Sequence, residues 1–285
     1  MTERPFRIGI VAPAGRMDEG AAARVTQLAA ATYGGRVELQ FHPQCFLSRG
    51  HFAGSDRERA DAFVEFANDA SVDAIWFARG GYGSFRIVGD AVPQLNGVAR
   101  RKLFVGYSDL GSLLGALRVQ SFPYVAHGPM PADILRPGGE AAVSRALKFM
   151  VERADEVVDP VAREGGPCLA FNMTILSRLI GTPHIPDLRG HVVMLEEVSE
   201  YIYGIDRTLG QIMSSAAIRG VAGIRLGRCT LIPPNEPEFG MSEVEVMQHW
   251  CSRAGIPYLG RADIGHDVEN KVVPFGNLND FRSIS

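Results

Sequence analysis

Short apolar runs alternate with amphipathic segments along the first half of the chain. The apolar runs RIGIVAPAG, VELQF and DAIWFARGG are separated by DEGAAARVTQLAAATYG and SDRERADAFVEFANDA, in which apolar residues recur at helical spacing. Alternating strands and helices are typical of a parallel sheet with helices on both faces. We therefore predict an α/β fold whose N-terminal domain contains a parallel, Rossmann- or flavodoxin-like sheet. Ser55 and Glu58 form a capping-box pattern that predicts the start of the second helix.

The composition changes between about Pro131 and Pro167. Proline, glycine and charged residues gather there around one helical segment, EAAVSRALKFMVERA, and such a change is typical of a crossing between domains. We predict an N-terminal domain over residues 1–135, a linker over 136–166 and a C-terminal domain over 167–285.

The remaining sequence mixes strand-like and helical patterns. The runs HVVMLEEV, AGIRLGRCTL, IPYLG and ENKVVPFGN read as strands, and helical patterns cover 172–180, 205–218 and 242–253. The second domain is therefore expected to be smaller, mixed in structure and rich in β-strands.

Composition excludes several classes of protein. The chain has 285 residues, 46% of them hydrophobic, and a formal net charge of −3, so no basic surface for nucleic acid or an anionic membrane is expected. The apolar run IGIVA near the N-terminus is too short for a signal-peptide core, which favours a cytoplasmic location. Four scattered cysteines without a C-x-x-C pair fit neither a zinc site nor a disulfide scaffold.

Three candidate sites follow predicted strands of the N-terminal sheet: RGGYG (79–83), GYSD (106–109) and HGPM (127–130). Ligands of open parallel sheets bind beyond the carboxyl ends of the strands. The glycines of RGGYG can adopt positive φ and direct N–H groups at an anion, although a lone glycine cluster is often only a flexible turn. The G-x-G-x-x-G dinucleotide fingerprint is missing.

Ser108 has two interpretations. Serine before an apolar helix commonly caps that helix, whereas serine on a strand-to-helix turn can be a nucleophile. The pattern here is G-x-S-x-x-G, which matches the nucleophile elbow imperfectly.

A serine nucleophile needs a base and an orienting carboxylate. His266 lies on a glycine-containing loop after a strand-like segment, and Glu196 and Glu197 directly follow the apolar run 192–195. Because side chains alternate along a strand, only one of the two glutamates can point into a given crevice. Acids at a strand end can also be solvated and inert.

Taken together, RGGYG, GYSD, HGP, LEEVSE with YGIDR, and GHDVENKVVPFG resemble the LD-carboxypeptidase family of serine peptidases, whose relatives hydrolyse microcin-type acylated nucleotides. The resemblance runs from about residue 8 to 277. It implies Ser108 as nucleophile, Glu196 as acid, His266 as base, and an oxyanion hole from backbone N–H groups of Gly81 or its neighbour and of Asp109. It also implies two domains with the active site at their junction.

The same resemblance implies an activity. The expected reaction is removal of the terminal D-alanine from murein tetrapeptides, without metal or organic cofactor, by a homodimer. A free C-terminal carboxylate requires a nearby cation, for which Arg79 and Arg207 are candidates. Further candidates for substrate contact are Gly80, Tyr82 and Asn172. The sequence departs from the family where Ala170 and Phe171 replace a usual glycine pair before Asn172, and where Asp267 follows His266.

Two alternatives stay open. The same three residues could hydrolyse a peptide–nucleotide or another amide, because pocket residues decide the substrate. A non-catalytic α/β protein could instead bind a small ligand, with Ser108 serving only as a cap and ligand contact. A binding protein would have no need for Glu196 and His266 to converge on Ser108.

Overall fold

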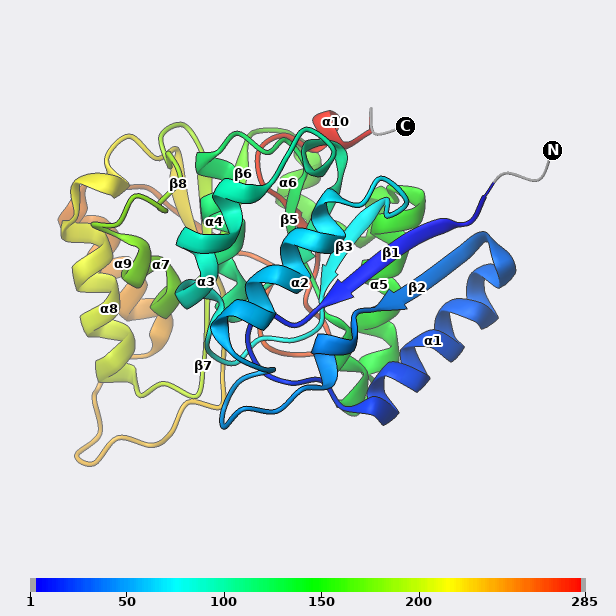
Figure 1. The fold of residues 1–285 in the computed structure, drawn as a ribbon. Coiled ribbons are helices and arrows are strands. Elements are labelled where there is room, and N and C mark those ends of the chain that lie inside the picture. Colours follow the sequence, from blue (N-terminus) through cyan, green and yellow to red (C-terminus); the bar gives the residue numbers. More distant parts are fainter. Residues whose placement is uncertain (1–3, 283–285) are drawn as a thin grey trace.

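The larger sheet contains six strands within residues 4–282, the part of the chain that this computed structural model describes. Its order is β10-β5-β4-β3-β1-β2, with every pair parallel except β10 and β5. Figure 1 shows β1, β2 and β3 side by side. The bounds of the six strands are β1 (Phe6–Val11), β2 (Val37–Phe41), β3 (Ala74–Phe77), β4 (Leu103–Gly106), β5 (Val125–His127) and β10 (Val273–Pro274).

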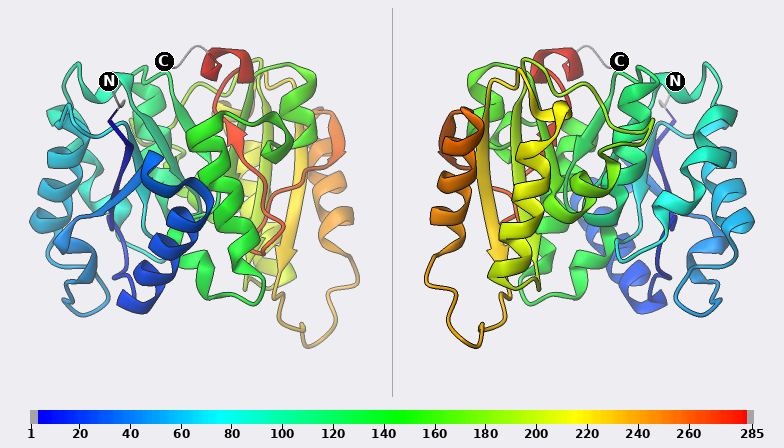
Figure 2. Two further views of the ribbon diagram at one scale, coloured as in Figure 1. Left: turned by 90° about the vertical axis from the view of Figure 1, so that its right-hand side faces the viewer. Right: turned by 90° about the vertical axis from the view of Figure 1, so that its left-hand side faces the viewer.

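Helices cover both faces of this sheet (Figure 2). One face carries α1 and α5, which contact each other, and the opposite face carries α2, α3 and α4. Strands β3 and β4 are buried along their whole length, as a sheet covered on both sides requires. The helices are α1 (Glu19–Tyr33), α2 (Asp56–Asn68), α3 (Ser84–Ala91), α4 (Gly111–Val119) and α5 (Gly139–Glu152). Helix α2 begins at the predicted Ser55–Glu58 capping box.

A second, smaller sheet follows, in the order β6-β7-β8-β9. All its pairs are parallel, and helices connect the successive strands, so this region is itself an α/β layer. The predicted α/β class, with a larger parallel sheet and a smaller second unit, is confirmed. The elements are β6 (Cys168–Asn172), α7 (Met173–Leu179), β7 (Val192–Val198), α8 (Ile202–Ser214), β8 (Gly223–Thr230), α9 (Glu243–Ala254) and β9 (Tyr258–Arg261), with short helices α6 (Pro160–Glu164) and α10 (Leu278–Phe281).

The C-terminal segment links the two sheets. Strand β10 pairs antiparallel with β5, and directly after it Gly276 exchanges backbone hydrogen bonds of 2.8 and 3.0 Å with Cys168 on β6. The segment 136–166 contains α5, which packs against α1. The division of the chain at residues 135 and 167 stays a prediction. Within the described residues, no helix combines the length and apolar character needed to cross a membrane.

The start of α5 provides a test of packing. A Cβ on Gly139 would lie 1.9 Å from the carbonyl oxygen of Asp133, a backbone atom that cannot move aside cheaply. We expect Gly139→Ala to lower the free energy of unfolding by about 1–3 kcal/mol or more, measured by urea denaturation. Gly89→Ala, in α3 with open space around its Cβ, should instead stabilise the protein by up to about 1 kcal/mol. Equal midpoints for the two variants would contradict this packing.

Candidate active site

Ser108 occupies a strained turn between β4 and α4. Its φ is 61°, in the left-handed region that costs a non-glycine residue about 1–3 kcal/mol. Tyr107 before it is extended, and a 3-10 turn at Ser108–Leu110 leads into α4. No side chain caps that turn or α4, so Ser108 is not an N-cap. Its hydroxyl contacts His266, in the loop between β9 and β10.

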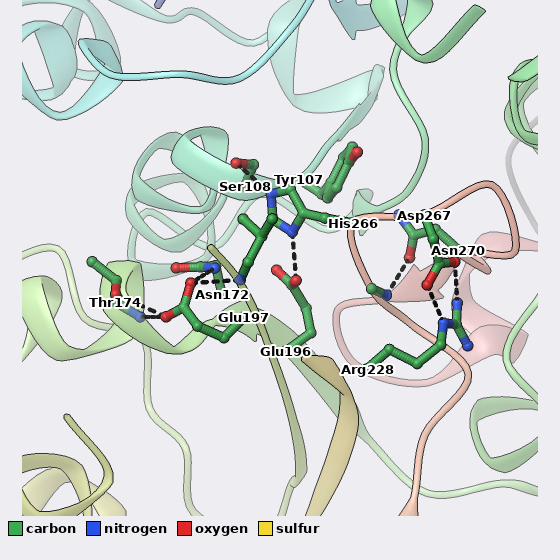
Figure 3. A network of polar contacts seen from close by, with 12 residues as sticks. Tyr107, Ser108, Asn172, Thr174, Glu196, Glu197, Arg228, His266, Asp267 and Asn270 are labelled. Atoms are coloured by element: carbon green, nitrogen blue, oxygen red, sulfur yellow. Dashed lines mark hydrogen bonds and ion pairs between the residues drawn. The ribbon is translucent and has the colours of Figure 1, made fainter. Parts of the chain in front are cut away.

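Ser108, His266 and Glu196 form one chain of hydrogen bonds (Figure 3). Ser108 Oγ lies 2.9 Å from His266 Nε2, and His266 Nδ1 lies 2.5 Å from Glu196 Oε2. A carboxylate only accepts, so Nδ1 carries the proton and Nε2 accepts from the serine hydroxyl. The three residues come from the turn after β4, from β7 and from the loop between β9 and β10. This is the connectivity that serine hydrolases use.

The two adjacent glutamates of β7 have different surroundings. Glu196 is fully buried and faces His266, as described. Glu197 accepts hydrogen bonds from Asn172 Nδ2 at 2.7 Å and from Thr174 N at 3.0 Å and Oγ1 at 2.8 Å. Alternation along the strand separates the two carboxylates, so Glu196 alone reaches the imidazole.

Several charges act on His266. Burial by itself lowers the pKa of the imidazole, but the adjacent Glu196 carboxylate outweighs burial and raises the pKa above its ordinary value of 6.5. Arg136 opposes this rise and Asp133 adds to it. His266 is therefore neutral and able to accept a proton only above that raised pKa.

The loop that carries His266 is held by arginines from two other elements. Arg228 on β8 pairs with Asp267 Oδ1 at 2.9 Å and with Asp263 at 2.5 Å. Arg145 on α5 donates to the carbonyl oxygens of Val268 and Asn270, at 2.8 and 2.9 Å. Figure 3 shows Arg228, Asp267 and Asn270 around the base of this loop. Asp267, which departs from the family pattern, thus anchors the loop.

Asn270 also connects the loop to the larger sheet. Its Oδ1 lies 3.2 Å from the backbone nitrogen of Gly265, which donates to it, and 3.0 Å from Nε2 of His127 at the end of β5. Burial lowers the pKa of His127 below its ordinary value, so this imidazole is neutral near pH 7. A neutral His127 with its proton on Nε2 donates to Asn270 and keeps the loop beside β5.

The glycine-rich loop RGGYG lies against Ser108. A Cβ on Gly80 would lie 2.9 Å from Ser108 Cβ, and Gly81 has a φ of 115° that favours glycine. Asp109 ties this loop to the turn, because its buried carboxylate accepts from Ser84 N at 2.8 Å and its carbonyl oxygen accepts from Ser84 Oγ at 2.6 Å. Burial raises the pKa of the Asp109 carboxyl group.

A cavity of about 410 Å³ opens over the serine. Arg79, Gly80, Gly81, Ser108 and His266 all line it. The structure thus brings five of the sequence-predicted residues to one cavity.

Three of the candidate substrate contacts lie outside the lining of this cavity. The amide of Asn172 is engaged within the protein, since it caps α7 through Oδ1 and donates to Glu197. Tyr82 is 52% exposed beside the rings of His51 and Phe52. Arg207 stacks over Tyr203 on the surface of α8.

Sequence reasoning missed a polar cluster in the cavity. Tyr107 donates its hydroxyl hydrogen to Asp133 Oδ1 at 2.9 Å, and Arg136 pairs with the same carboxylate at 3.2 Å. All three line the cavity with Ser108. The available signal was the acid and base of PADILRPGG, which follows β5 and the HGPM motif at the same edge of the sheet.

The fold and site have the form of a serine hydrolase. Models of the LD-carboxypeptidase N-terminal and C-terminal domains match residues 8–128 and 165–279. A protein of Streptomyces coelicolor named as a carboxypeptidase is 31% identical over 234 residues, 79% of this chain and 74% of that protein. The chain belongs to the LD-carboxypeptidase family of serine peptidases, and as such it is a serine carboxypeptidase.

More distant relatives share the fold. The murein tetrapeptide carboxypeptidase of Pseudomonas aeruginosa is 26% identical over 79% of this chain and 78% of its own length. The crystal structure of muramoyltetrapeptide carboxypeptidase from Oxalobacter formigenes superimposes with a TM-score of 0.76 at 23% identity, covering 94% of this chain and 93% of that one. The structure of the microcin C7 self-immunity protein MccF in complex with aspartyl sulfamoyl adenosine superimposes with a TM-score of 0.78 at 17% identity. The match covers 98% of this chain and 95% of that one.

The pKa of His266 is directly measurable. In wild type, the Cε1 proton should titrate above pH 6.5 by NMR. Glu196→Gln removes the attracting charge and leaves burial to dominate, so we expect the pKa to fall below 6.5. Glu269→Gln, on the same loop but with its side chain 68% exposed, should leave the titration unchanged. Identical curves for wild type and Glu196→Gln would contradict the assigned contact.

Proposed function

We propose that this carboxypeptidase hydrolyses the L,D-peptide bond that attaches the terminal D-alanine of murein tetrapeptides. The observation that supports it most is the contact of Ser108 Oγ with His266 Nε2 in the cavity, because Nδ1 of the same imidazole is hydrogen-bonded to the buried Glu196. The relative from Pseudomonas aeruginosa is a murein tetrapeptide carboxypeptidase by name. The proposal assigns the same substrate class to this chain.

The first half of the reaction acylates the serine. His266 accepts the hydroxyl proton through Nε2 while Ser108 Oγ attacks the scissile carbonyl carbon, and Glu196 stabilises the imidazolium that forms. Backbone N–H groups of Gly81 or its neighbour and of Asp109 are proposed to donate to the oxyanion. Removing one such donor costs about 3 kcal/mol of transition-state stabilisation in other hydrolases. His266 then gives the proton to the amine of the departing D-alanine.

The second half releases the shortened peptide. A water molecule loses a proton to His266 and attacks the acyl carbon, and the imidazolium returns that proton to Ser108 Oγ. The turn geometry supports this cycle, because the left-handed φ keeps the serine hydroxyl at the base in the free protein. Ser108 Oγ and His266 Nε2 are already within hydrogen-bond distance.

Other parts of the expectation belong to the same proposal. A peptide–nucleotide of the microcin type is the alternative substrate, and it can be tested in parallel with the tetrapeptide. The protein is proposed to act in the cytoplasm as a homodimer, a state that sedimentation equilibrium of the purified chain decides.

Loss of the serine hydroxyl tests the nucleophile. We expect Ser108→Ala to lower kcat for D-alanine release from a murein tetrapeptide by about 10⁴- to 10⁶-fold, as loss of the nucleophile does in other serine peptidases. Ser121→Ala is a matched control, because Ser121 has a similar φ of 58° but lies exposed after α4. It should retain wild-type activity. Comparable D-alanine release by Ser108→Ala and wild type would rule out this serine as the nucleophile.

The close approach of Gly80 provides a second test. In Gly80→Ala the new methyl group would lie 2.9 Å from Ser108 Cβ and 3.0 Å from its Oγ, which must displace the hydroxyl. Misplacement of a reacting group by about 1 Å costs on the order of 10²-fold in rate, so kcat should fall by that amount. Gly97→Ala, with open space around its Cβ, should keep full activity. A fully active Gly80→Ala would show that this contact does not position the serine.

A further inference from the structure

Two arginines that line the cavity differ in how firmly the protein holds them. Arg79 and Arg136 both line it with Ser108 and His266. Arg79 is exposed at the start of the glycine-rich loop, and its hydrogen bonds with the described residues are long, 3.3 Å to the carbonyl oxygen of Gly80 and 3.4 Å to that of Arg16. It therefore lies on the side of the proposed oxyanion hole and is weakly fixed.

Arg136 is held in place by the protein. Its Nε lies 3.2 Å from Asp133 Oδ1, its Nη2 donates to the hydroxyl of Tyr107 at 3.3 Å, and its Nη1 donates to the carbonyl oxygen of His266. Asp133 is fixed in turn by the Tyr107 hydroxyl and by the backbone N–H of Met130, at 2.9 and 2.8 Å. The guanidinium is thus oriented before any substrate arrives.

The guanidinium keeps donors for a ligand. Arginine has five N–H groups, and contacts with the described residues engage three of them through Nε, Nη1 and Nη2. Its side chain is 35% exposed, whereas that of Asp133 is 9% exposed, so the cation reaches the cavity more than its counter-ion does. An oriented cation with two remaining donors is suited to a carboxylate.

The chemistry of the leaving group indicates where its carboxylate must lie. His266 Nε2 has to reach the departing amine within hydrogen-bond distance, about 3 Å. In D-alanine the carboxylate carbon lies about 2.5 Å from that nitrogen, because only the Cα separates them. The carboxylate therefore lies on the histidine side of the cavity, where Arg136 bonds the His266 backbone.

We propose that Arg136 binds the free C-terminal carboxylate of the substrate and so makes the enzyme a carboxypeptidase. This inference rests on the proposed hydrolysis at Ser108. Asp133 and Tyr107 act as positioning residues that orient the guanidinium. Arg136 would then have two roles, because it lines the cavity that binds the substrate's C-terminus and also bonds the backbone of His266, the base.

A pair of substrates tests the assignment. Murein tetrapeptide with a terminal D-alanine is compared with the same peptide ending in D-alaninamide, and D-alanine or D-alaninamide release is followed. A hydrogen-bonded charge is worth about 1.5–3 kcal/mol, so wild type should prefer the free acid by roughly 10- to 100-fold in kcat/KM. In Arg136→Gln this ratio should fall to near 1. Arg136→Lys keeps a charge and should retain part of the preference.

The ratio separates recognition from structure. If Arg136 only holds the His266 loop, Arg136→Gln lowers kcat/KM for both peptides equally and the ratio persists, which overturns the inference. Arg79→Gln is the matched control and should keep the wild-type ratio. A ratio near 1 in Arg79→Gln would instead assign carboxylate binding to Arg79. If wild type releases nothing from either peptide, the proposed function itself fails, and this inference fails with it. If Arg136→Gln does not fold, the other two variants decide. The inference is overturned if Arg136→Lys keeps the wild-type ratio of kcat/KM for the two peptides while the ratio in Arg79→Gln falls to near 1.

Discussion

Burial of the Glu196 carboxylate is the constraint on which the rest of the site depends. The side chain has no exposed surface, and His266 is its hydrogen-bond partner. Leaving a buried charged group without a hydrogen-bond partner costs about 1–3 kcal/mol or more, so the fold is favoured when an imidazole N–H lies beside this carboxylate. That requirement explains why the His266 loop is held by Arg228, Arg145 and Asn270. Anchoring the loop keeps the carboxylate paired and, by the same contacts, keeps the imidazole at Ser108.

The serine turn is the opposite case, because there the fold stores strain. A left-handed φ at Ser108 persists only where its neighbours leave no better conformation. Glycines make the necessary room: a Cβ on Gly80 would meet Ser108, and one on Gly106 would lie 2.8 Å from Phe77 Cδ2. Asp109 then fixes the glycine loop to the turn through Ser84. The strained Ser108 comes from the larger sheet, and the His266 imidazole that accepts its hydroxyl proton is paired with Glu196 of the smaller sheet.

Much of this arrangement could be predicted from the sequence, because it follows local patterns. Alternating apolar runs predict parallel strands, and the GYSD and GHD motifs mark strand ends and loops. For the Arg136 cluster the sequence offers only the acid and base of PADILRPGG, since the contacts with Tyr107 depend on how the turn after β5 folds back. Asn172 shows the converse: the family resemblance suggested a substrate contact, but capping α7 and pairing with Glu197 use its amide. Arg207 lies on an exposed face of α8, and the helical periodicity of the sequence does not show whether that face is turned toward the active site.

The pairing of β10 with β5 has a consequence for the order in which the protein is made. Chains fold from the N-terminus as they leave the ribosome, and the larger sheet can assemble around Ser108 while β5 is still an unpaired edge. His266 follows Ser108 by 158 residues, and β10 follows His266. The nucleophile is therefore synthesised well before its base. A nascent chain that has not yet reached His266 carries the serine without the imidazole, so the segment from His266 through β10 both completes the hydrogen-bonded site and pairs the free edge of β5.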